Sequence, residues 1–323
     1  MKKETPLIKI KNWTISIILA VLMFFGLQCH SSNASLKFVQ LSDAHFSTGK
    51  LNTTYKMLAE SPRLLDDAIS QINAMSNVSF VMFTGDQINR PYEKELNAFL
   101  PYAQKLNVPW YFAFGNHDTM VDGYLSPSVY MYLVNKYNKN YKFTKTYYSF
   151  VPQKGYKVIV LDSIIREVLT SKGRIGEAQL AWLDNELKNS QKDTVLIFIH
   201  GPIIEPYSSP NHRTVDASKV EEVLKKYKNP IAVFQGHYHA ARILQKDNIL
   251  YVTCPSLVSY PNAFRVITVT NQKNQVKFNI ELKETGLKNV QRLAKLLVFG
   301  TTIFSGEEND QNAVITIEKG IKR

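Results

Sequence analysis

Seven short apolar runs constrain the fold of this 323-residue chain more than any other feature. They are rich in Val, Ile and Phe without strict alternation of polar and apolar residues, a pattern typical of strands buried on both faces. The strands that they predict are Leu36–Leu41, Ser79–Phe83, Val108–Phe114, Tyr156–Leu161, Thr194–Ile199, Pro230–Phe234 and Ile249–Thr253. Segments with apolar residues at helical spacing lie between several of them, over Arg63–Met75, Glu93–Leu106, Glu177–Leu187 and Ala217–Tyr227. Because strands alternate with helices, we predict an α/β fold.

Polar side chains directly follow five of the predicted strands. The segments are Ser42-Asp43-Ala44-His45, Gly85-Asp86, Gly115-Asn116-His117-Asp118, His200-Gly201-Pro202 and Gly236-His237-Tyr238-His239. Glycine precedes Asp86, Asn116 and His237, which leaves room for the backbone and an ion to approach closely. Open α/β sheets build their sites at the carboxyl ends of strands, so we expect a site at that edge.

Spacing within two of the segments suggests shared ligands. Residues two apart on an extended backbone point to the same side, so Asp43 and His45 are expected to bind one ion together. His237 and His239 repeat the arrangement, with Tyr238 turned away. Each segment alone is a weak signal, since polar residues are common in turns and a lone histidine is more often structural. Their recurrence at five strand ends favours a metal site.

The motifs as a set resemble those of a known family. They are Asp43-x-His45, Gly85-Asp86-x-x-Asn89, Gly115-Asn116-His117-Asp118, His200-x-Pro202 and Gly236-His237-x-His239, and they are similar to the motifs of the calcineurin-like metallophosphoesterases. All stand in the family's order and span residues 43 to 239. The resemblance implies a four-layer α-β-β-α sandwich with two divalent metal ions above the carboxyl ends of the strands. Oxygen and imidazole ligands without thiolates point to Mn, Fe, Zn or Co.

The resemblance also implies a role for each motif residue. Seven would bind the ions: Asp43, His45 and His239 the first, Asn116, His200 and His237 the second, and Asp86 both. His117 would face the scissile phosphoester, and Asp118 would orient His117.

The resemblance implies that the protein hydrolyses a small anionic phosphoester. In that reaction a water bridging the two ions would lose a proton and attack phosphorus. Gly173–Leu183 and Thr253–Ser256 are similar to segments of bacterial class III cyclic-nucleotide phosphodiesterases, which favours a diesterase. A cyclic nucleotide, a phospholipid head group, a scavenged nucleotide and an envelope phosphodiester stay open as substrates. The loop Glu205–Val215 either contacts substrate or is an ordinary solvated loop, and its candidate contacts are Ser208, Asn211, His212 and Arg213.

Other functions make different predictions. A phosphomonoesterase of the same family would carry the same motifs, whereas a nuclease predicts a basic stripe with interleaved aromatic residues, which the sequence does not show. A non-catalytic scaffold is expected to have lost metal ligands or His117, and this chain has lost none. The net charge of +12 favours anionic partners, but no basic run suggests nucleic acid, and no protein partner is predicted.

Residues 1–34 read as an export signal. Four lysines precede the uncharged stretch from Trp13 to Leu27, the arrangement of a secretory signal that is short for a membrane span. Cleavage after Ala34 and a lipoprotein site at Cys29 both fit, and an uncleaved anchor is the third option. We therefore expect an exported protein, periplasmic or attached to the envelope as a lipoprotein. Cys254 is the other of two cysteines, so no internal disulfide is expected and Cys254 should be a buried thiol.

The rest of the chain divides into two predicted parts. Residues 35–283 form the metallophosphoesterase domain, ending in a hairpin of Arg265–Thr270 and Gln275–Leu282. Residues 284–323 form a helix and tail that pack on the domain. The helix carries a stripe of apolar residues, Leu287, Val290, Leu293, Leu296 and Leu297, with Lys288, Arg292 and Lys295 elsewhere on its surface. We expect the stripe to pack on the domain. The alternative is a basic amphipathic helix that lies on a membrane. The polar segment Gly306–Gln311 is expected to be loose.

Overall fold

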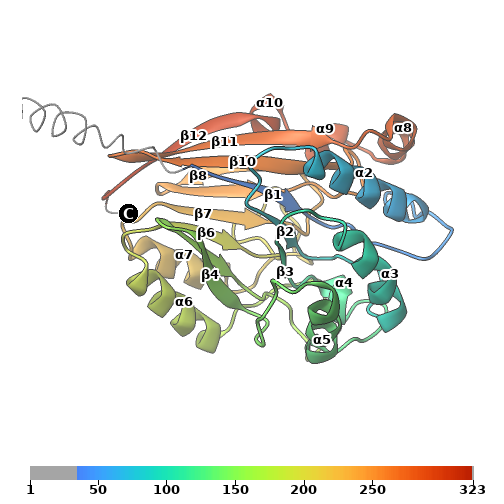
Figure 1. Cartoon of the computed structure of the whole chain (residues 1–323), viewed down its shortest axis with the longest axis horizontal. Helices are drawn as coiled ribbons and strands as arrows, with labels where there is room; N and C mark the ends of the chain where they lie inside the picture. Colours follow the sequence, from blue (N-terminus) through green and yellow to red (C-terminus); the bar gives the residue numbers. More distant parts are fainter. Residues whose placement is uncertain (1–34, 322–323) are drawn as a thin grey trace, which may run out of the picture. The chain divides into compact units, whose positions relative to one another are not determined.

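Two six-stranded β-sheets form the centre of the chain in the computed structural model, which describes residues 35–321 (Figure 1). The first sheet has the order β12-β11-β10-β1-β2-β3 and the second the order β4-β5-β6-β7-β9-β8. The first comprises β1 (Ser35–Leu41), β2 (Phe80–Thr84), β3 (Trp110–Ala113), β10 (Ala263–Asn271), β11 (Gln275–Glu284) and β12 (Ala313–Glu318). The second comprises β4 (Tyr148–Gln153), β5 (Tyr156–Val160), β6 (Thr194–Phe198), β7 (Ile231–Gln235), β8 (Arg242–Lys246) and β9 (Ile249–Thr253).

Helices cover the outer face of each sheet. Those on the first sheet are α2 (Ser61–Asn73), α3 (Glu93–Ala103) and α5 (Pro127–Tyr137), and those on the second are α6 (Glu177–Asn189) and α7 (Ala217–Lys225) (Figure 1). Between the sheets, the ring of Phe38 lies 5.1 Å from that of Phe234. On the outer side, the ring of Phe83 lies 5.6 Å from that of Phe99 in α3. The predicted four-layer α-β-β-α sandwich is therefore confirmed.

The parallel strands bring their carboxyl ends to one edge. β1, β2 and β3 run parallel in the first sheet, as do β5, β6, β7 and β9 in the second. The buried amide of Gln40 joins the two sheets near that edge, because its Nε2 donates to Thr84 Oγ1 at 3.1 Å and to the Gln235 carbonyl at 3.1 Å. Cys254 lies beside it as a free, buried thiol, as predicted.

The sequence analysis missed three edge strands and several short helices. It did not predict β4, β8 or β12, whose half-exposed residues give neither a continuous apolar run nor a clear alternation. It also missed α5 and made β3 seven residues long, whereas the strand has four. Within residues 35–321, none of the helices combines the length and apolar character needed to cross a bilayer. The predicted export signal and Cys29 lie outside the described residues.

The C-terminal region differs from the expectation. In α8 (Lys288–Leu297) Val290 and Ala294 are buried, but Leu293, Leu296 and Leu297 are exposed to solvent. The leucines at these three positions therefore do not pack on the domain as the sequence analysis expected. After α8 come the short helices α9 (Thr301–Ser305) and α10 (Glu308–Gln311), and then β12, which adds a strand to the first sheet.

The segment Gly306–Gln311 is tied to the domain rather than loose. Asp310 is buried, and its carboxylate accepts hydrogen bonds from Arg242 Nη1 at 3.1 Å and from the Ile243 amide at 2.9 Å. The buried guanidinium of Arg265 donates to the Asp310 carbonyl at 2.7 Å. Nothing in the polar stretch around Asp310 predicts these contacts from the sequence.

We expect Asp310→Ala to lower the free energy of unfolding by about 2–3 kcal/mol, because it leaves Arg242 and a backbone N–H without their acceptor. Urea unfolding measures the change. Glu308→Ala, an exposed position in the same short helix, is the matched control and should change stability by less than about 0.5 kcal/mol. Equal stability of both variants would mean that the tail contributes little to the fold.

Candidate metal centre

One group of ligand atoms lies between the ends of β1 and β7. His239 Nε2 is 3.4 Å from Asp43 Oδ1 and 3.2 Å from His45 Nε2. Each of these three residues offers a ligand atom within 4.8 Å of the other two, and all three are buried. We call Asp43, His45 and His239 the first cluster.

A second group lies between the ends of β2, β3, β6 and β7. Asp86, His200 and His237 offer ligand atoms within 4.8 Å of one another and form the second cluster. The amide oxygen of Asn116 joins it, because His200 Nε2 lies 3.1 Å from Asn116 Oδ1. All seven residues that the sequence analysis named as metal ligands are thus brought together at one edge.

Asp86 lies between the two clusters. Its Oδ2 is 3.5 Å from His45 Nε2 in the first cluster and 3.4 Å from His200 Nε2 in the second. Its other oxygen, Oδ1, accepts a hydrogen bond from the His117 amide at 2.8 Å. One carboxylate oxygen therefore faces imidazoles of both clusters.

The backbone that presents these ligands is not extended. Five of the residues adopt positive φ, a conformation that is uncommon outside glycine: Asp43 (51°), His45 (36°), Asp86 (52°), His237 (73°) and His239 (55°). Asp43 and His45 nevertheless lie in one cluster, as the sequence analysis expected, although the backbone between them is not extended. His237 and His239 belong to different clusters. Such strained conformations concentrate at functional sites, where the surrounding structure holds them in place.

Hydrogen bonds on their outer sides fix two of the imidazoles. His200 Nδ1 lies 2.8 Å from the Thr84 carbonyl, and His237 Nε2 lies 2.8 Å from the Ser171 carbonyl. A carbonyl oxygen can only accept, so these nitrogens carry the proton. In the neutral ring the opposite nitrogen then offers a lone pair, as a metal ligand requires.

The residues fit a pair of divalent cations. Asp43 Oδ1 and His45 Nδ1 are buried and have no hydrogen-bond partner among the described residues, an arrangement that costs free energy in the absence of a ligand. Carboxylate, imidazole and amide groups without a thiolate match borderline first-row metals.

The pKa values of the histidines follow from burial and from Asp86. Burial, with the charge of His200, lowers the pKa of His237 to about 3, and burial lowers that of His45 well below its usual value. Burial alone would lower the pKa of His200 as well, but attraction by the Asp86 carboxylate raises it to about 9. In the metal-free protein a proton on His200 thus takes the place of a cation.

His117 lies beside the clusters on α4 (Asn116–Thr119). Its ring is 4.6 Å from that of His45, and one of its nitrogens is within 4.8 Å of ligand atoms of His45 and Asp86. Its Nδ1 lies 2.8 Å from the Asn89 carbonyl, so Nδ1 carries a proton and donates it to that oxygen. Burial lowers the pKa of His117, which keeps the ring neutral near pH 7 in the metal-free protein.

Asp118 does not orient the His117 imidazole, contrary to what the resemblance implied. Its Oδ2 accepts hydrogen bonds from the amides of Gly115 at 2.7 Å and Asp86 at 3.0 Å, and its Oδ1 accepts from Ile88 at 3.2 Å. Asn89 holds the imidazole instead. Asp118 therefore joins the turn after β3 to the turn after β2, and it positions Asp86 rather than His117.

Close approach requires glycine at three positions beside the ligands. A Cβ at Gly115 would overlap the amide nitrogen and Oδ1 of Asp86, and one at Gly85, where φ is +91°, would overlap the His200 ring. A Cβ at Gly236 would likewise overlap Ser42 Oγ. The expectation that the glycines before Asp86, Asn116 and His237 permit close approach is therefore confirmed.

A cavity of about 200 Å³ opens beside the clusters. Its lining consists of Tyr55, Tyr207, Ser209, His212, His237, Tyr238, His239 and Phe304. Of the loop residues that the sequence analysis singled out, only His212 reaches this cavity. Tyr207, Ser209 and Phe304 were not foreseen, because aromatic and small polar residues in loops carry no periodic signal.

Lys56 was also missed. Its side chain is buried next to the clusters, and Nζ lies 5.6 Å from the centre of the Tyr55 ring. No hydrogen bond or ion pair engages this ammonium group within residues 35–321, and its charge is close enough to lower the pKa of His45 and His117. Nothing in the polar loop around it signals this placement.

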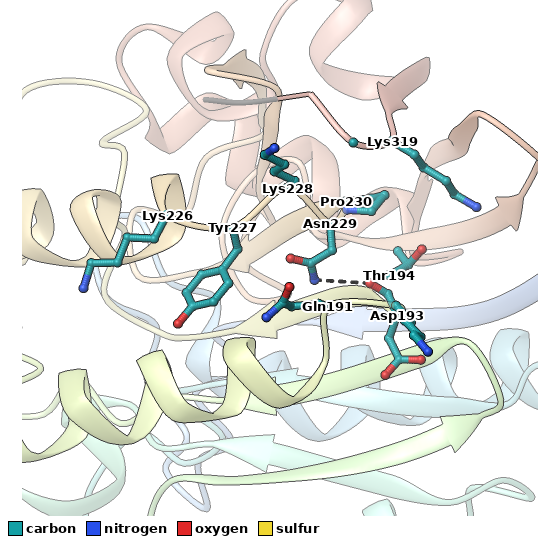
Figure 2. A pocket seen from close by; sticks show the side chains of 11 residues that line it. Gln191, Asp193, Thr194, Lys226, Tyr227, Lys228, Asn229, Pro230 and Lys319 are labelled. Atoms are coloured by element: carbon teal, nitrogen blue, oxygen red, sulfur yellow. Dashed lines mark hydrogen bonds between the residues drawn. The ribbon is translucent and has the colours of Figure 1, made fainter.

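A second cavity, of about 410 Å³, lies at the amino-terminal ends of β6 and β7, away from the clusters (Figure 2). Four lysines line it, but Figure 2 shows Lys226 and Lys319 pointing away from each other rather than toward a common point. Asn229 Nδ2 donates to the Asp193 carbonyl at 3.2 Å across its floor. This cavity lacks the convergent groups that the metal clusters have.

Comparison with known families agrees with the geometry. The model of the calcineurin-like phosphoesterase family matches residues 36–241, and the chain belongs to that family. It is therefore a metal-dependent phosphoester hydrolase of a family that uses two metal ions.

Curated relatives span the same region. The chain is 26% identical over 224 residues to a "probable glycerophosphodiester phosphodiesterase GpdQ" of Arcobacter nitrofigilis, covering 68% of this chain and 77% of the relative. It is 24% identical over 221 residues to a "probable cyclic nucleotide phosphodiesterase" of Vesicomyosocius okutanii, covering 68% and 84%. A tartrate-resistant acid phosphatase type 5 of Oryctolagus cuniculus is 22% identical, with 73% and 77% covered.

Solved structures share the fold. A dimetal phosphatase from Danio rerio superimposes with a TM-score of 0.59 at 17% identity, covering 75% of this chain and 95% of the other. GAP50 of Plasmodium, described as the anchor in the inner membrane complex, has a TM-score of 0.50 at 12% identity, with 90% of each chain covered. At these identities the similarity concerns the fold alone.

Binding of metal is expected to release about one proton at pH 7, because an ion on His200 Nε2 displaces the proton held there below pH 9. Apparent affinity should then rise about tenfold per pH unit between pH 7 and pH 9, and level off above it. Calorimetry with Mn²⁺ in buffers of different ionisation enthalpy counts the protons. His212→Asn, in the cavity but outside both clusters, should leave the count unchanged. A count of zero would contradict the charge assigned to His200.

Proposed function

We propose that this protein is a phosphodiesterase that uses two metal ions held by the first and second clusters. The observation that supports this most directly is the placement of Asp86 Oδ2 between imidazoles of both clusters, 3.5 Å and 3.4 Å away. The names of the relatives favour a diester, since a glycerophosphodiester phosphodiesterase and cyclic nucleotide phosphodiesterases are among them.

Seven residues would hold the ions: Asp43, His45 and His239 the first, Asn116, His200 and His237 the second, and Asp86 both. When bound, the ions supply positive charge for the phosphate oxygens and a water activated at neutral pH. In the overall reaction, water adds across one P–O ester bond, and an alcohol and a phosphomonoester leave.

His117 would act as the general acid that protonates the leaving group. Its Nδ1–H is fixed by the Asn89 carbonyl, which leaves Nε2 to exchange a proton with the departing oxygen. Burial lowers the pKa of His117, and the negative charge of a bound phosphate opposes that effect and favours the protonated ring.

Lys56 would bind a phosphate oxygen. Within residues 35–321 this buried ammonium group has no hydrogen-bond or ion-pair partner, which is costly, and an anion beside the clusters would supply one. Lysine acts here as a point charge on a long stem, which suits a phosphate oxygen.

The aromatic cavity suits a diester better than a monoester. A monoester has one organic group, whereas a diester has two, of which one leaves and one stays. Tyr55, Tyr207 and Phe304 form an apolar wall of the 200 Å³ cavity, and this wall gives the second group a place beside His239.

A non-catalytic scaffold is the second candidate, because GAP50 shares the fold and is described as an anchor. Against it, every donor group of both clusters is present, and so is His117. We further propose that the protein is exported and that Cys29 carries a lipid, on the strength of the leader sequence. Mass analysis of the mature N-terminus distinguishes lipidation from cleavage after Ala34.

We expect protein reconstituted with Mn²⁺ to hydrolyse bis-p-nitrophenyl phosphate faster than p-nitrophenyl phosphate. His117→Ala should lower kcat by about 10²–10⁴-fold, the usual contribution of a general acid, with metal content unchanged. Metal analysis of each preparation is the control. Turnover of the monoester alone would contradict the diesterase proposal, and no turnover of either with both metals bound would favour the scaffold.

Lys56→Met is expected to lower kcat/KM for bis-p-nitrophenyl phosphate by about 10–100-fold, the effect of losing a hydrogen bond to a charged group. Stability should not fall, because Met fills similar space without a buried charge. Lys50→Met, on the exposed part of the same loop, is the matched control and should retain activity. If both variants behave alike, Lys56 does not contact the phosphate.

A further inference from the structure

An apolar strip remains on the outside of the C-terminal helices. Five side chains within eleven residues are exposed: Leu293 (44%), Leu296 (83%), Leu297 (36%), Phe299 (95%) and Ile303 (53%). We call this set the α8–α9 face. Single exposed leucines are ordinary, but a contiguous set that includes a fully exposed phenylalanine marks a surface that binds something apolar.

The apolar residues of α8 extend beyond the side that packs on the domain. At 100° per residue, Val290 and Ala294 define the buried side of α8, and Leu297, Leu293 and Leu296 continue the same arc onto the solvent side. The arc is therefore too wide for the domain to cover. The part of the arc that the domain leaves uncovered can contact another apolar surface.

Basic residues complete the helix surface. Lys288, Arg292 and Lys295 lie on the side opposite the buried stripe, with Arg292 about 40° from Leu296 by helix geometry. No carboxylate occurs between Glu284 and Glu307. Lys288 is paired with Glu284 at 2.6 Å, so Arg292 and Lys295 supply the positive charge. An apolar strip bordered by these two cations is complementary to the surface of an anionic bilayer.

The charges argue against a second copy of the chain as the occupant. A twofold dimer would place the same patch on both sides, so Arg292 and Lys295 of one copy would approach those of the other. A bilayer has no such conflict, because long basic side chains can extend toward its head groups while leucines enter the acyl region.

The α8–α9 face is continuous with the cavity of the metal centre. β11 runs parallel to β1, so α8 begins at the edge that carries the clusters (Figure 1). In α9, Ile303 points to solvent, while the next residue, Phe304, lines the cavity beside His237 and His239. Docking of this face would therefore bring Phe304 and the cavity that it lines toward the bilayer.

We propose that the α8–α9 face binds an anionic lipid bilayer and presents the metal centre to phosphodiesters in lipid head groups. The substrate part of this proposal rests on the proposed phosphodiesterase function, whereas the docking part does not. Of the substrates that the sequence left open, it selects the phospholipid head group.

The test compares binding to vesicles with turnover of a soluble substrate. The double variant Leu296→Glu/Phe299→Glu in the full chain should bind vesicles of phosphatidylglycerol and phosphatidylcholine at least about tenfold more weakly than wild type. Its turnover of bis-p-nitrophenyl phosphate should stay within about twofold of wild type, because neither residue lines the cavity. Val151→Glu/Val314→Glu, which charges two exposed strand positions, is the matched control and should bind normally.

A tryptophan placed in the α8–α9 face reports whether this face itself contacts lipid. It thereby distinguishes the face from the leader, whose contribution to vesicle binding is common to all variants. Leu296→Trp should show a blue-shifted emission with vesicles and quenching by brominated lipid, beyond the signal of the three native tryptophans measured in wild type. Binding should fall with salt and should be weak to pure phosphatidylcholine, since the cations act through anionic lipid.

Three outcomes would overturn the docking proposal: unchanged vesicle binding in the double variant, no quenching at position 296, or a wild-type dimer that the double variant converts to monomer without any effect on lipid. Hydrolysis of phosphatidylglycerol in vesicles tests the substrate. Wild-type protein that turns over bis-p-nitrophenyl phosphate and binds vesicles but leaves the lipid intact would overturn the substrate alone. Vesicle binding without turnover of the soluble diester would instead refute the proposed function.

Discussion

The carboxylate of Asp86 is the constraint on which the rest of the site depends. It lies between two groups of imidazoles that come from strands of both sheets, and its own backbone has a positive φ. A buried carboxylate in a strained turn needs support, and Asp118 supplies it by accepting the amides of Asp86, Ile88 and Gly115. Gly115 makes that contact possible because any side chain there would overlap Asp86. Asp118 is therefore essential to the geometry without pointing at the reaction.

The four-layer fold makes this arrangement possible. Ligands from one sheet alone would lie along a line, whereas the site needs donors on two sides of a pair of ions. The packing of Phe38 against Phe234 sets the two sheets face to face, and Gln40 joins them where the strands end. The C-terminal tail takes part as well, because Asp310 fixes it to β8 and Phe304 reaches the cavity. A region that looked like an appendage in the sequence thus forms one wall of the candidate site.

The sequence was most informative where many residues repeat one physical pattern. Buried parallel strands such as β6 and β9 were located within a residue or two, and each polar segment after a strand proved to lie at the common edge. It failed where a single contact decides the outcome. The resemblance implies that Asp118 orients the imidazole of His117, whereas the Asn89 carbonyl holds that ring. Nothing in the sequence predicts that Lys56 is buried beside the clusters. The spacing of His237 and His239 predicts an extended backbone, whereas both residues have positive φ and their rings belong to different clusters.

Apolar periodicity by itself determined the α/β class and the edge that carries the site, and the order of the polar motifs as a set pointed to the seven candidate ligands, because these features depend on patterns that repeat along the chain. What holds each imidazole, how the backbone turns at each ligand and which lysine lies beside the clusters were decided only by the tertiary structure, because residues far apart in the chain must meet before such contacts exist. The exposed leucines of α8 belong to the second kind. Their spacing predicts an apolar stripe, but only the packed domain shows how much of that stripe it leaves uncovered.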